Sequence, residues 1–176
     1  MKELNPKNIL SKVVVNVGVG KLSQQAGFED KILPQVVADI SAITGQKPRE
    51  NRAKKSIAGF KLRQGQVVGI QSTLRGQKMV DFFERMVRIV LPRVHDFKGI
   101  SMHSIDDHGS LHVGFKEQDV FPELNSEEAH FNFSLGVNIV PKPGKKDEII
   151  EAYKQLGVPF AKGEDTKKKA KKKKRK

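Results

Sequence analysis

The stretch VVVNVGVGK, residues 13–21, alternates in a way that decides the fold of the chain. Every second residue is a valine: Val13, Val15, Val17 and Val19. Successive side chains of a β-strand point to opposite faces, so the valines share one face and Asn16 and Gly18 share the other. We therefore expect a strand over residues 12–19, with its valine face in the core and its other face open.

The glycines and Lys21 also invite a second interpretation, a phosphate-binding loop. Such a loop requires glycine five positions before Gly20 and a hydroxyl residue after the lysine. The chain has Val15 and Leu22 at these two positions. The dinucleotide-binding pattern G-x-G-x-x-G fails as well, because residue 23 is serine. The stretch therefore predicts a strand rather than a nucleotide site.

Apolar periodicity predicts the remaining elements, since spacings of three and four indicate helices and alternation indicates strands. The expected helices cover residues 29–44, 76–91 and 145–156, and the expected strands cover residues 67–75, 111–116 and 131–140. Residues 46–66 are polar, basic and punctuated by glycine, which predicts a loop or a hairpin with extended arms. Short links between strands, with helices over one side, favour an α+β two-layer sandwich with a mostly antiparallel sheet.

Particular residues mark the helix ends. Pro34 suits the first turn of the first helix, and Gly45 is placed to stop it. Pro92 is expected to end the second helix. On the outer side of that helix Asp81 precedes Arg85 by four residues, and Glu84 precedes Arg88 by four. Both are expected ion pairs that would partly neutralise the two arginines.

Positive charge is concentrated in two parts of the 176-residue chain, whose formal net charge is +13. Residues 46–93 hold twelve Lys or Arg against three acidic residues, and residues 162–176 hold ten against two. Such blocks indicate a polyanion bound at one face, with nucleic acid the leading candidate, whereas charge that only serves solubility is usually spread out. The length suits one domain, expected over residues 1–161, followed by a disordered Lys-rich tail over residues 162–176.

Other classes of protein are disfavoured by the composition. The chain has no cysteine, which removes disulfides and thiolate zinc sites. No apolar run reaches the roughly 18 residues of a membrane span, and the N-terminus lacks the apolar core of a secretory signal, so we expect a cytoplasmic protein without a membrane partner. His103, His108 and His112 lie on a loop running into a strand, where their side chains would not converge on a metal. No group of residues predicts an enzyme or a cofactor.

The basic segment over residues 46–66 is the strongest candidate for binding. It contains seven cations: Lys47, Arg49, Arg52, Lys54, Lys55, Lys61 and Arg63. Such cations neutralise phosphates, and Gly59 and Gly65 let the backbone approach a sugar–phosphate chain closely. Ile57 and Phe60 are apolar residues among these charges. Phe60 either stacks on a base or ribose, or folds back to plug the core beneath the loop, and the sequence leaves both open.

The strand expected over residues 67–75 extends the open face. Gln71, Thr73 and Arg75 form its polar side and should lie beside Asn16 and Gly18. A face with amide, hydroxyl and guanidinium groups around a small glycine can lie against a nucleic-acid backbone. The alternative is that Asn16 and Thr73 make ordinary hydrogen bonds that support the sheet edge or a loop, and the residues alone support it nearly as well.

Six blocks of the chain, taken in order, resemble one known family: NVGVG (16–20), ITGQKP (43–48), KKSIAGFKLRQG (54–65), TLRG (73–76), LPRVHDFKGIS (91–101) and GFKEQDVFPE (114–123). The family is the bacterial large-subunit ribosomal protein L-five family, the universal 5S-rRNA-binding ribosomal proteins. The resemblance runs over roughly residues 9–160, and six ordered blocks are far more specific than any single motif.

This resemblance implies a structural protein of the cytoplasmic ribosome, without catalysis, in the central protuberance of the large subunit. Proteins of the family bind 5S rRNA and adjacent 23S rRNA through the sheet face and neighbouring loops, among other large-subunit proteins. Carried over by position, the 5S rRNA-binding residues would be Asn16, Gln46, Lys47, Phe60, Thr73 and Arg75.

The resemblance also implies contacts beyond 5S rRNA. The family's long loop reaches toward P-site tRNA, which assigns that contact to Lys54, Lys55, Ser56, Ile57, Gly59, Lys61 and Arg63. The loop after FPE faces the small-subunit head protein S-thirteen in an intersubunit bridge, which assigns that contact to Glu123, Glu127 and Glu128. Acidic residues suit a basic partner there. We expect the Lys-rich tail to clamp rRNA, with a solubilising role as the alternative.

Overall fold

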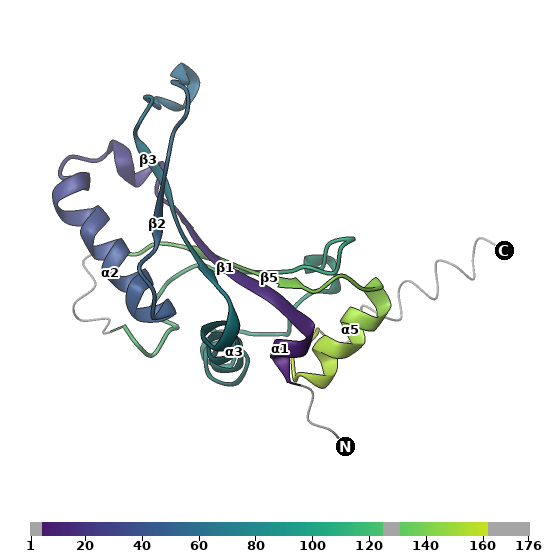
Figure 1. The fold of residues 1–176 in the computed structure, drawn as a ribbon. Coiled ribbons are helices and arrows are strands. Elements are labelled where there is room, and N and C mark those ends of the chain that lie inside the picture. The colour runs from purple at the N-terminus through teal and green to yellow at the C-terminus, as the bar shows by residue number, and fades with distance from the viewer. Residues whose placement is uncertain (1–4, 125–130, 162–176) are drawn as a thin grey trace.

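The structure, a computed structural model of the chain, describes residues 5–124 and 131–161 (Figure 1). Its strands are β1 Leu10–Gly18, β2 Arg49–Arg52, β3 Val67–Leu74, β4 Leu111–Phe115 and β5 Leu135–Pro141. Its α-helices are α1 Pro6–Ile9, α2 Leu33–Thr44, α3 Gly76–Arg85, α4 Leu91–Arg93 and α5 Lys146–Gln155. Shorter turns of other helical type are η1 Leu22–Gln24, η2 Phe28–Ile32, η3 Ala58–Phe60, η4 Met86–Val90 and η5 Met102–Ser104. The tail expected over residues 162–176 lies outside the described residues.

The valine-rich stretch forms the middle strand of the sheet. Within the described residues the strands are ordered β2–β3–β1–β5–β4, and each neighbouring pair is antiparallel. Asn16 of β1 lies opposite Gln71 of β3 on one side and opposite Gly136 of β5 on the other. β1 therefore has a hydrogen-bonded neighbour along each edge, which is why its alternation decides the fold.

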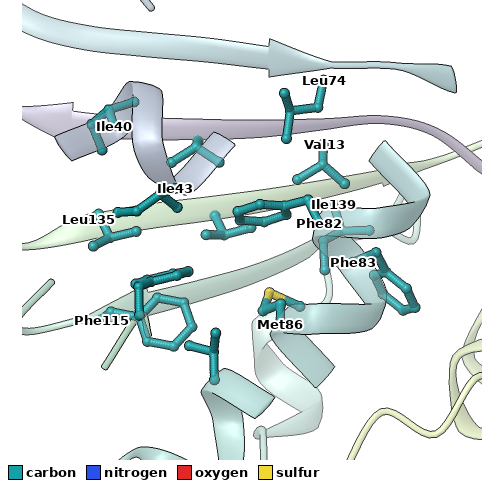
Figure 2. Packing of buried hydrophobic residues seen from close by; sticks show 14 of the residues in the cluster. Val13, Ile40, Ile43, Leu74, Phe82, Phe83, Met86, Phe115, Leu135 and Ile139 are labelled. Carbon is teal, nitrogen blue, oxygen red and sulfur yellow. The ribbon is translucent and has the colours of Figure 1, made fainter. Parts of the chain in front are cut away.

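Helices cover one face of this sheet, so the predicted α+β two-layer sandwich is confirmed (Figure 1). The four alternating valines of residues 13–19 are each at most 2% exposed. Figure 2 shows Val13 and Ile139 of the sheet in one cluster with Phe82 of α3 and Ile43 of α2. Each such side chain stabilises the fold by about 1.5–3 kcal/mol when it leaves water, so the valine face holds the two layers together.

Three phenylalanines join the helical layer to the edge of the sheet at β4. Phe121 is fully buried, and its ring packs edge-on against Phe115 with 5.3 Å between ring centroids. The ring of Phe82 stacks against Phe121 at 6.3 Å. Aromatic pairs in these arrangements gain more than their buried area alone. The turn that follows β4 is therefore anchored in the core by Phe121.

One of the two long helical stretches ends where the sequence predicted, and the other extends further. η2 leads into α2, and Gly45 ends α2 at a left-handed φ of 63°, as expected. The second helical stretch passes through Pro92 and ends at Arg93, so the expectation that Pro92 ends it is wrong. In η4 the N–H of Leu91 bonds to the carbonyl of Met86, five residues earlier. Because the hydrogen bonds of this wider turn no longer follow the α-helical pattern, the N–H that Pro92 lacks is not needed to continue the helical stretch.

The predicted ion pairs Asp81–Arg85 and Glu84–Arg88 are both wrong, since neither is present within the described residues. Arg85 Nε lies 2.7 Å from Glu123 Oε1, and Arg85 Nη2 donates to the carbonyl of Ile43 at 2.6 Å. Asp81 accepts a hydrogen bond from Gln77 instead. The last turn of a helix leaves carbonyls without helical partners, and a guanidinium can satisfy one while it pairs with a carboxylate. Arg85 thereby connects α2, α3 and the turn containing Glu123.

No helix within residues 5–124 and 131–161 is long and apolar enough to cross a membrane.

Candidate nucleic-acid interface

The face of the sheet opposite the helices is called the open face below. Its strand residues follow from the register: Lys12, Val14, Asn16, Gly18, Arg49, Asn51, Gly69, Gln71, Thr73, His112, Gly114, Gly136, Asn138 and Val140. None of these strand residues is acidic, whereas Lys12 and Arg49 are basic. A surface of this kind attracts a polyanion, because the strand residues that form it include cations and no carboxylate.

One row of residues crosses the open face from edge to edge. From β2 to β4 it consists of Arg49, Gln71, Asn16, Gly136 and Gly114. Gln71 Oε1 accepts a hydrogen bond from Asn51 at 3.2 Å. Within the described residues neither Asn16 nor Thr73 has a side-chain hydrogen bond, so the alternative in which they support an edge or a loop is not found. The row presents guanidinium and amide groups at one end and bare backbone at the other.

Glycines on four strands form the floor of a hollow of about 470 Å³ in the open face: Gly18, Gly69, Gly114 and Gly136. Asn16 and Asn51 also line it. The side-chain oxygen of Asn16 lies so close to Gly136 that a β-carbon on Gly136 would collide with it. Above Gly18 and Gly114, where a β-carbon would have no heavy atom within 4 Å, a ribose or phosphate can approach the sheet backbone directly.

Most of the predicted 5S rRNA-binding residues gather where β3 turns into α3. Gln46 Nε2 donates to the carbonyl of Thr73 at 3.2 Å, which ties the end of α2 to β3. Lys47 and Arg75 are exposed beside this contact. Lys78 Nζ adds a bond to the carbonyl of Gly45 at 2.8 Å. Gln46, Lys47, Thr73 and Arg75 therefore form one group, and Asn16 lies on the neighbouring strand.

The basic loop, residues 54–66, continues the β2–β3 hairpin beyond the sheet (Figure 1). At its base the N–H of Ala53 bonds to Gln66, and the N–H of Gly65 bonds back to Ala53, at 2.8 and 2.9 Å. Further out Ile57 and Leu62 form an antiparallel bridge. Hydrogen bonds across the hairpin thus order the expected extended arms almost to the tip.

Phe60 is 72% exposed at the tip of the basic loop, so its alternative placement as a plug for the core is wrong. Ile57 is 47% exposed beside it. Lys54, Lys55, Ser56, Gly59, Lys61 and Arg63, the other residues assigned to the tRNA contact, are also exposed on this loop. The tip combines an aromatic ring with cations, but it lies beyond the start of β3, whereas Arg75 lies between the end of β3 and the start of α3 (Figure 1).

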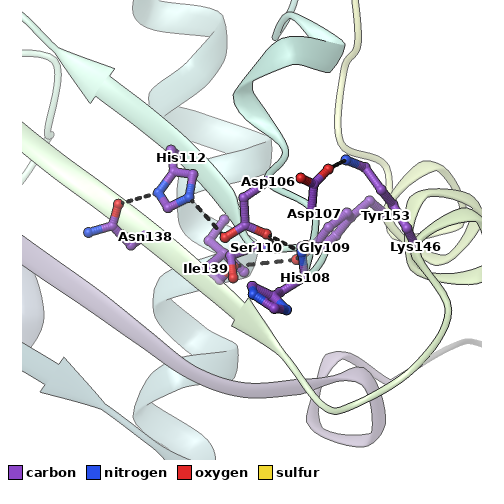
Figure 3. Close-up of polar contacts among 10 residues, drawn as sticks. All are labelled: Asp106, Asp107, His108, Gly109, Ser110, His112, Asn138, Ile139, Lys146 and Tyr153. Atoms are coloured by element: carbon purple, nitrogen blue, oxygen red, sulfur yellow. Dashed lines mark hydrogen bonds and ion pairs between the residues drawn. The ribbon is translucent and has the colours of Figure 1, made fainter.

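At the far edge of the open face, Asp106 organises a cluster of polar groups (Figure 3). One carboxylate oxygen accepts from the N–H groups of His108 and Ser110 at 2.9 and 2.7 Å. The other lies 3.5 Å from His112 Nε2, and His112 Nδ1 is 2.8 Å from the side-chain oxygen of Asn138. Burial acts to raise the pKa of Asp106, but hydrogen bonds from Ser110, His112 and His108 lower it below its usual range.

The turn over residues 106–110 is also held by two side chains of α5, one buried and one partly exposed to solvent. The hydroxyl of Tyr153 donates to the carbonyl of Gly109 at 3.0 Å, and burial raises the pKa of this phenol. Asp107 forms an ion pair with Lys146 at 3.0 Å. In the part of the chain that the structure describes, no group of three or more His, Asp or Glu could hold a metal ion. The side chains of His112, Asp106 and Asp107 are instead engaged in hydrogen bonds and ion pairs.

The acidic residues assigned to the intersubunit bridge are only partly placed. The side chain of Glu123 is 21% exposed, and its charge is paired with Arg85. Glu127 and Glu128 lie outside the described residues. Their contact with S-thirteen stays a prediction, and Glu123 contributes less free charge to it than the sequence suggests.

Sequence reasoning missed the half of the open face on β4 and β5. Gly136 and Asn138 alternate with Leu135, Val137 and Ile139, a period-two signal that could have identified them. Alternation within β3 and β4 places Gly69 on the side of Gln71 and Gly114 on the side of His112, but it does not say which strands are neighbours. Only the strand order brings these glycines into one hollow with Gly18.

Comparison with known proteins gives matches over nearly the whole chain. The family model for ribosomal protein L5 matches residues 7–63, and the model for the C-terminus of the same ribosomal family matches residues 67–160. Large ribosomal subunit protein uL5 of Fusobacterium nucleatum is 41% identical over 167 residues, 92% of this chain and 89% of the relative. The proteins of the same name from Chloroflexus aggregans and Anaeromyxobacter sp. (strain K) are 42% and 44% identical, each over 91% of this chain and 89% of the relative.

These matches cover the central strand, the basic loop, the whole open face and α5. They agree with an uncovered sheet face without acidic strand residues, and with the resemblance found in the sequence blocks. The chain belongs to the ribosomal protein L5 family and is a structural, non-enzymatic component of the large subunit of the cytoplasmic ribosome.

Proposed function

We propose that the open face and the basic loop bind 5S rRNA, with 23S rRNA adjacent, in the central protuberance of the large subunit. The observation that carries the proposal is the glycine-floored hollow in a sheet face without acidic strand residues. Binding of 5S rRNA is typical of the ribosomal protein L5 family, which supports the choice of this RNA.

The chemistry of the face suits an irregular RNA backbone. The amides of Asn16, which lines the hollow, and of Gln71, opposite Asn16 on β3, each offer donors and an acceptor to ribose hydroxyls and base edges. Lys47 and Arg75 neutralise phosphates at one end of β3, since both are exposed there. Phe60 offers a ring for stacking. Together, these amides, cations and the aromatic ring can recognise the shape of a folded RNA as well as its charge.

Two finer contacts belong to the same proposal. The basic loop extends beyond the sheet, which supports a contact between its cations and P-site tRNA while the open face stays on 5S rRNA. The segment after Glu123 is assigned to the bridge with S-thirteen, and the tail over residues 162–176 is assigned to rRNA. We treat residues 1–161 as one RNA-binding domain.

The proposal is tested by a gel-shift titration of the whole chain with 5S rRNA and with tRNA, at equal concentrations and moderate salt. We expect 5S rRNA to shift at a concentration of protein at least tenfold lower than tRNA, because shape-specific contacts add to the shared electrostatic attraction. A general RNA-binding protein that uses only its charge would bind both alike, and equal affinities would refute the proposal.

Arg75→Ala should reduce the salt dependence of 5S rRNA binding. Loss of one phosphate contact lowers the slope of log K against log salt concentration by about 0.7–0.9. Arg88→Ala is the matched control, because Arg88 is exposed on the helical layer rather than at the open face. The measurement is a set of binding isotherms between roughly 0.1 and 0.4 M salt. Equal slopes for the two variants would contradict the placement of Arg75 on the RNA.

A further inference from the structure

A groove of about 970 Å³ separates the basic loop from the segment that follows β1. Lys61, Arg63 and Gly65 line it on the side of the loop, and Phe28 and Glu29 line it on the other side. The loop therefore stands away from the body of the protein, and side-chain contacts across the groove decide how firmly it is held.

Gln66 makes the strongest set of contacts across this groove. Its Nε2 donates to the hydroxyl of Ser23 at 2.8 Å and to the carbonyl of Ser23 at 3.2 Å. Its Oε1 accepts from the N–H of Arg63 at 3.1 Å. The amide thus has partners on both atoms, which fixes its orientation and joins the loop to η1 over 43 positions of sequence.

Ser23 is itself held in place, so it can serve as an anchor. Its hydroxyl donates to the carbonyl of Gly20 at 2.9 Å, and its N–H bonds to the carbonyl of Val19 at 2.8 Å. The hydroxyl proton is directed to Gly20, which leaves an oxygen lone pair for Gln66. Val19 is fully buried beyond the end of β1, so the anchor rests on the core.

Gln24 adds a second contact nearer the tip. Its Nε2 donates to the carbonyl of Phe60 at 3.1 Å. Gln24 and Gln66 therefore hold the basic loop at two levels, one beside the exposed aromatic residue and one at the base. We infer that Ser23, Gln24 and Gln66 form a clamp that positions the basic loop, and that the loop meets RNA already ordered because of it.

The role of the clamp in RNA binding rests on the proposed function, whereas its ordering of the basic loop does not. A loop that samples many orientations binds with an affinity reduced by the fraction of time spent in the competent one. Removing the clamp should therefore weaken RNA binding without removing any cation or the Phe60 ring. The three clamp residues are positioning residues, since they act through the loop.

The test compares the double variant Gln24→Leu/Gln66→Leu with the matched control Gln64→Leu. Gln64 lines the same groove, but its backbone N–H, not its side chain, makes the bond to Ser56, and leucine keeps it. Hydrogen exchange on the protein alone should speed up at least tenfold at the amides of Ala53, Ile57, Leu62 and Gly65 in the double variant. The amides of β1 should exchange at the rate found in the unsubstituted protein.

The second readout is binding of 5S rRNA. The double variant should bind about tenfold more weakly with an unchanged salt slope, and the control should bind as the unsubstituted protein does. Ser23→Ala should share the defect in part, whereas Ser23→Thr should retain binding because it keeps the hydroxyl.

Unchanged exchange at the loop amides would overturn the clamp, whatever RNA the protein prefers. Faster exchange with unchanged affinity would overturn its role in binding. If the unsubstituted protein did not prefer 5S rRNA over tRNA, the proposed function would fail, and the exchange measurement would still decide whether the clamp exists.

Discussion

Gly18→Val should weaken binding of 5S rRNA about 100-fold and leave the protein as stable as before. Gly18 forms part of the floor of the hollow in the open face, between Asn16 and Gly69. A branched side chain there would keep an RNA backbone away from the amides of Asn16 and Gln71. Loss of two polar contacts at about 1–1.5 kcal/mol each corresponds to roughly 100-fold in affinity.

The fold should tolerate this substitution because the space above Gly18 is empty of protein. A β-carbon on Gly18 would have no heavy atom within 4 Å, and the residue opposite it on β3 is Gly69. Valine also favours the strand conformation. Chemical denaturation should therefore give a free energy of unfolding equal to or slightly above that of the unsubstituted protein.

Gly20→Val is the control for this prediction. Gly20 also has no heavy atom within 4 Å of a β-carbon position, but it lies beyond β1 and does not line the hollow. The control should bind 5S rRNA within about threefold of the unsubstituted protein, measured by filter binding. If Gly18→Val bound 5S rRNA as tightly as the unsubstituted protein does, the hollow would not be a site of close RNA contact, and the proposed interface would be wrong.

The sequence could predict the faces of single strands but not how the strands combine. Alternation alone placed Asn16 on the open side of β1 and Thr73 on the open side of β3, because a period of two is a local property. The row from Arg49 to Gly114 depends on strand order and register, which are set by packing between distant segments. For this reason the polar half of the site and Gly18 were predicted, whereas the glycines that β4 and β5 add to the hollow were not.

Long-range contacts determine two further features that local sequence rules could not predict. Helical spacing favoured Asp81 as the partner of Arg85, but Glu123 and a carbonyl at the end of α2 offered better acceptors. Gln66 and Ser23 are ordinary polar residues in the sequence, 43 positions apart, and only the folded hairpin makes them neighbours. A helix-pair rule worth a few tenths of a kcal/mol is easily outweighed by a guanidinium with two acceptors.

Phe121→Ala should lower the free energy of unfolding by about 3–5 kcal/mol, the largest effect on stability expected here. Its ring is fully buried between those of Phe82 and Phe115, so alanine leaves a cavity and removes both aromatic contacts. Since domains are commonly stable by about 5–15 kcal/mol, this loss is a large part of the total. Phe121→Leu should cost clearly less, because leucine refills most of the space.

Phe60→Ala makes the same chemical change at a side chain that is 72% exposed. Its effect on unfolding should be within about 0.5 kcal/mol, because no buried surface is lost. Its effect on RNA should be the larger one, since loss of one stacked base costs about 1–3 kcal/mol of binding. Denaturation and 5S rRNA binding measured on both variants should therefore show opposite patterns. A normal RNA affinity in Phe60→Ala would show that this ring does not stack on RNA, and a large loss of stability would contradict its exposure at the tip of the loop.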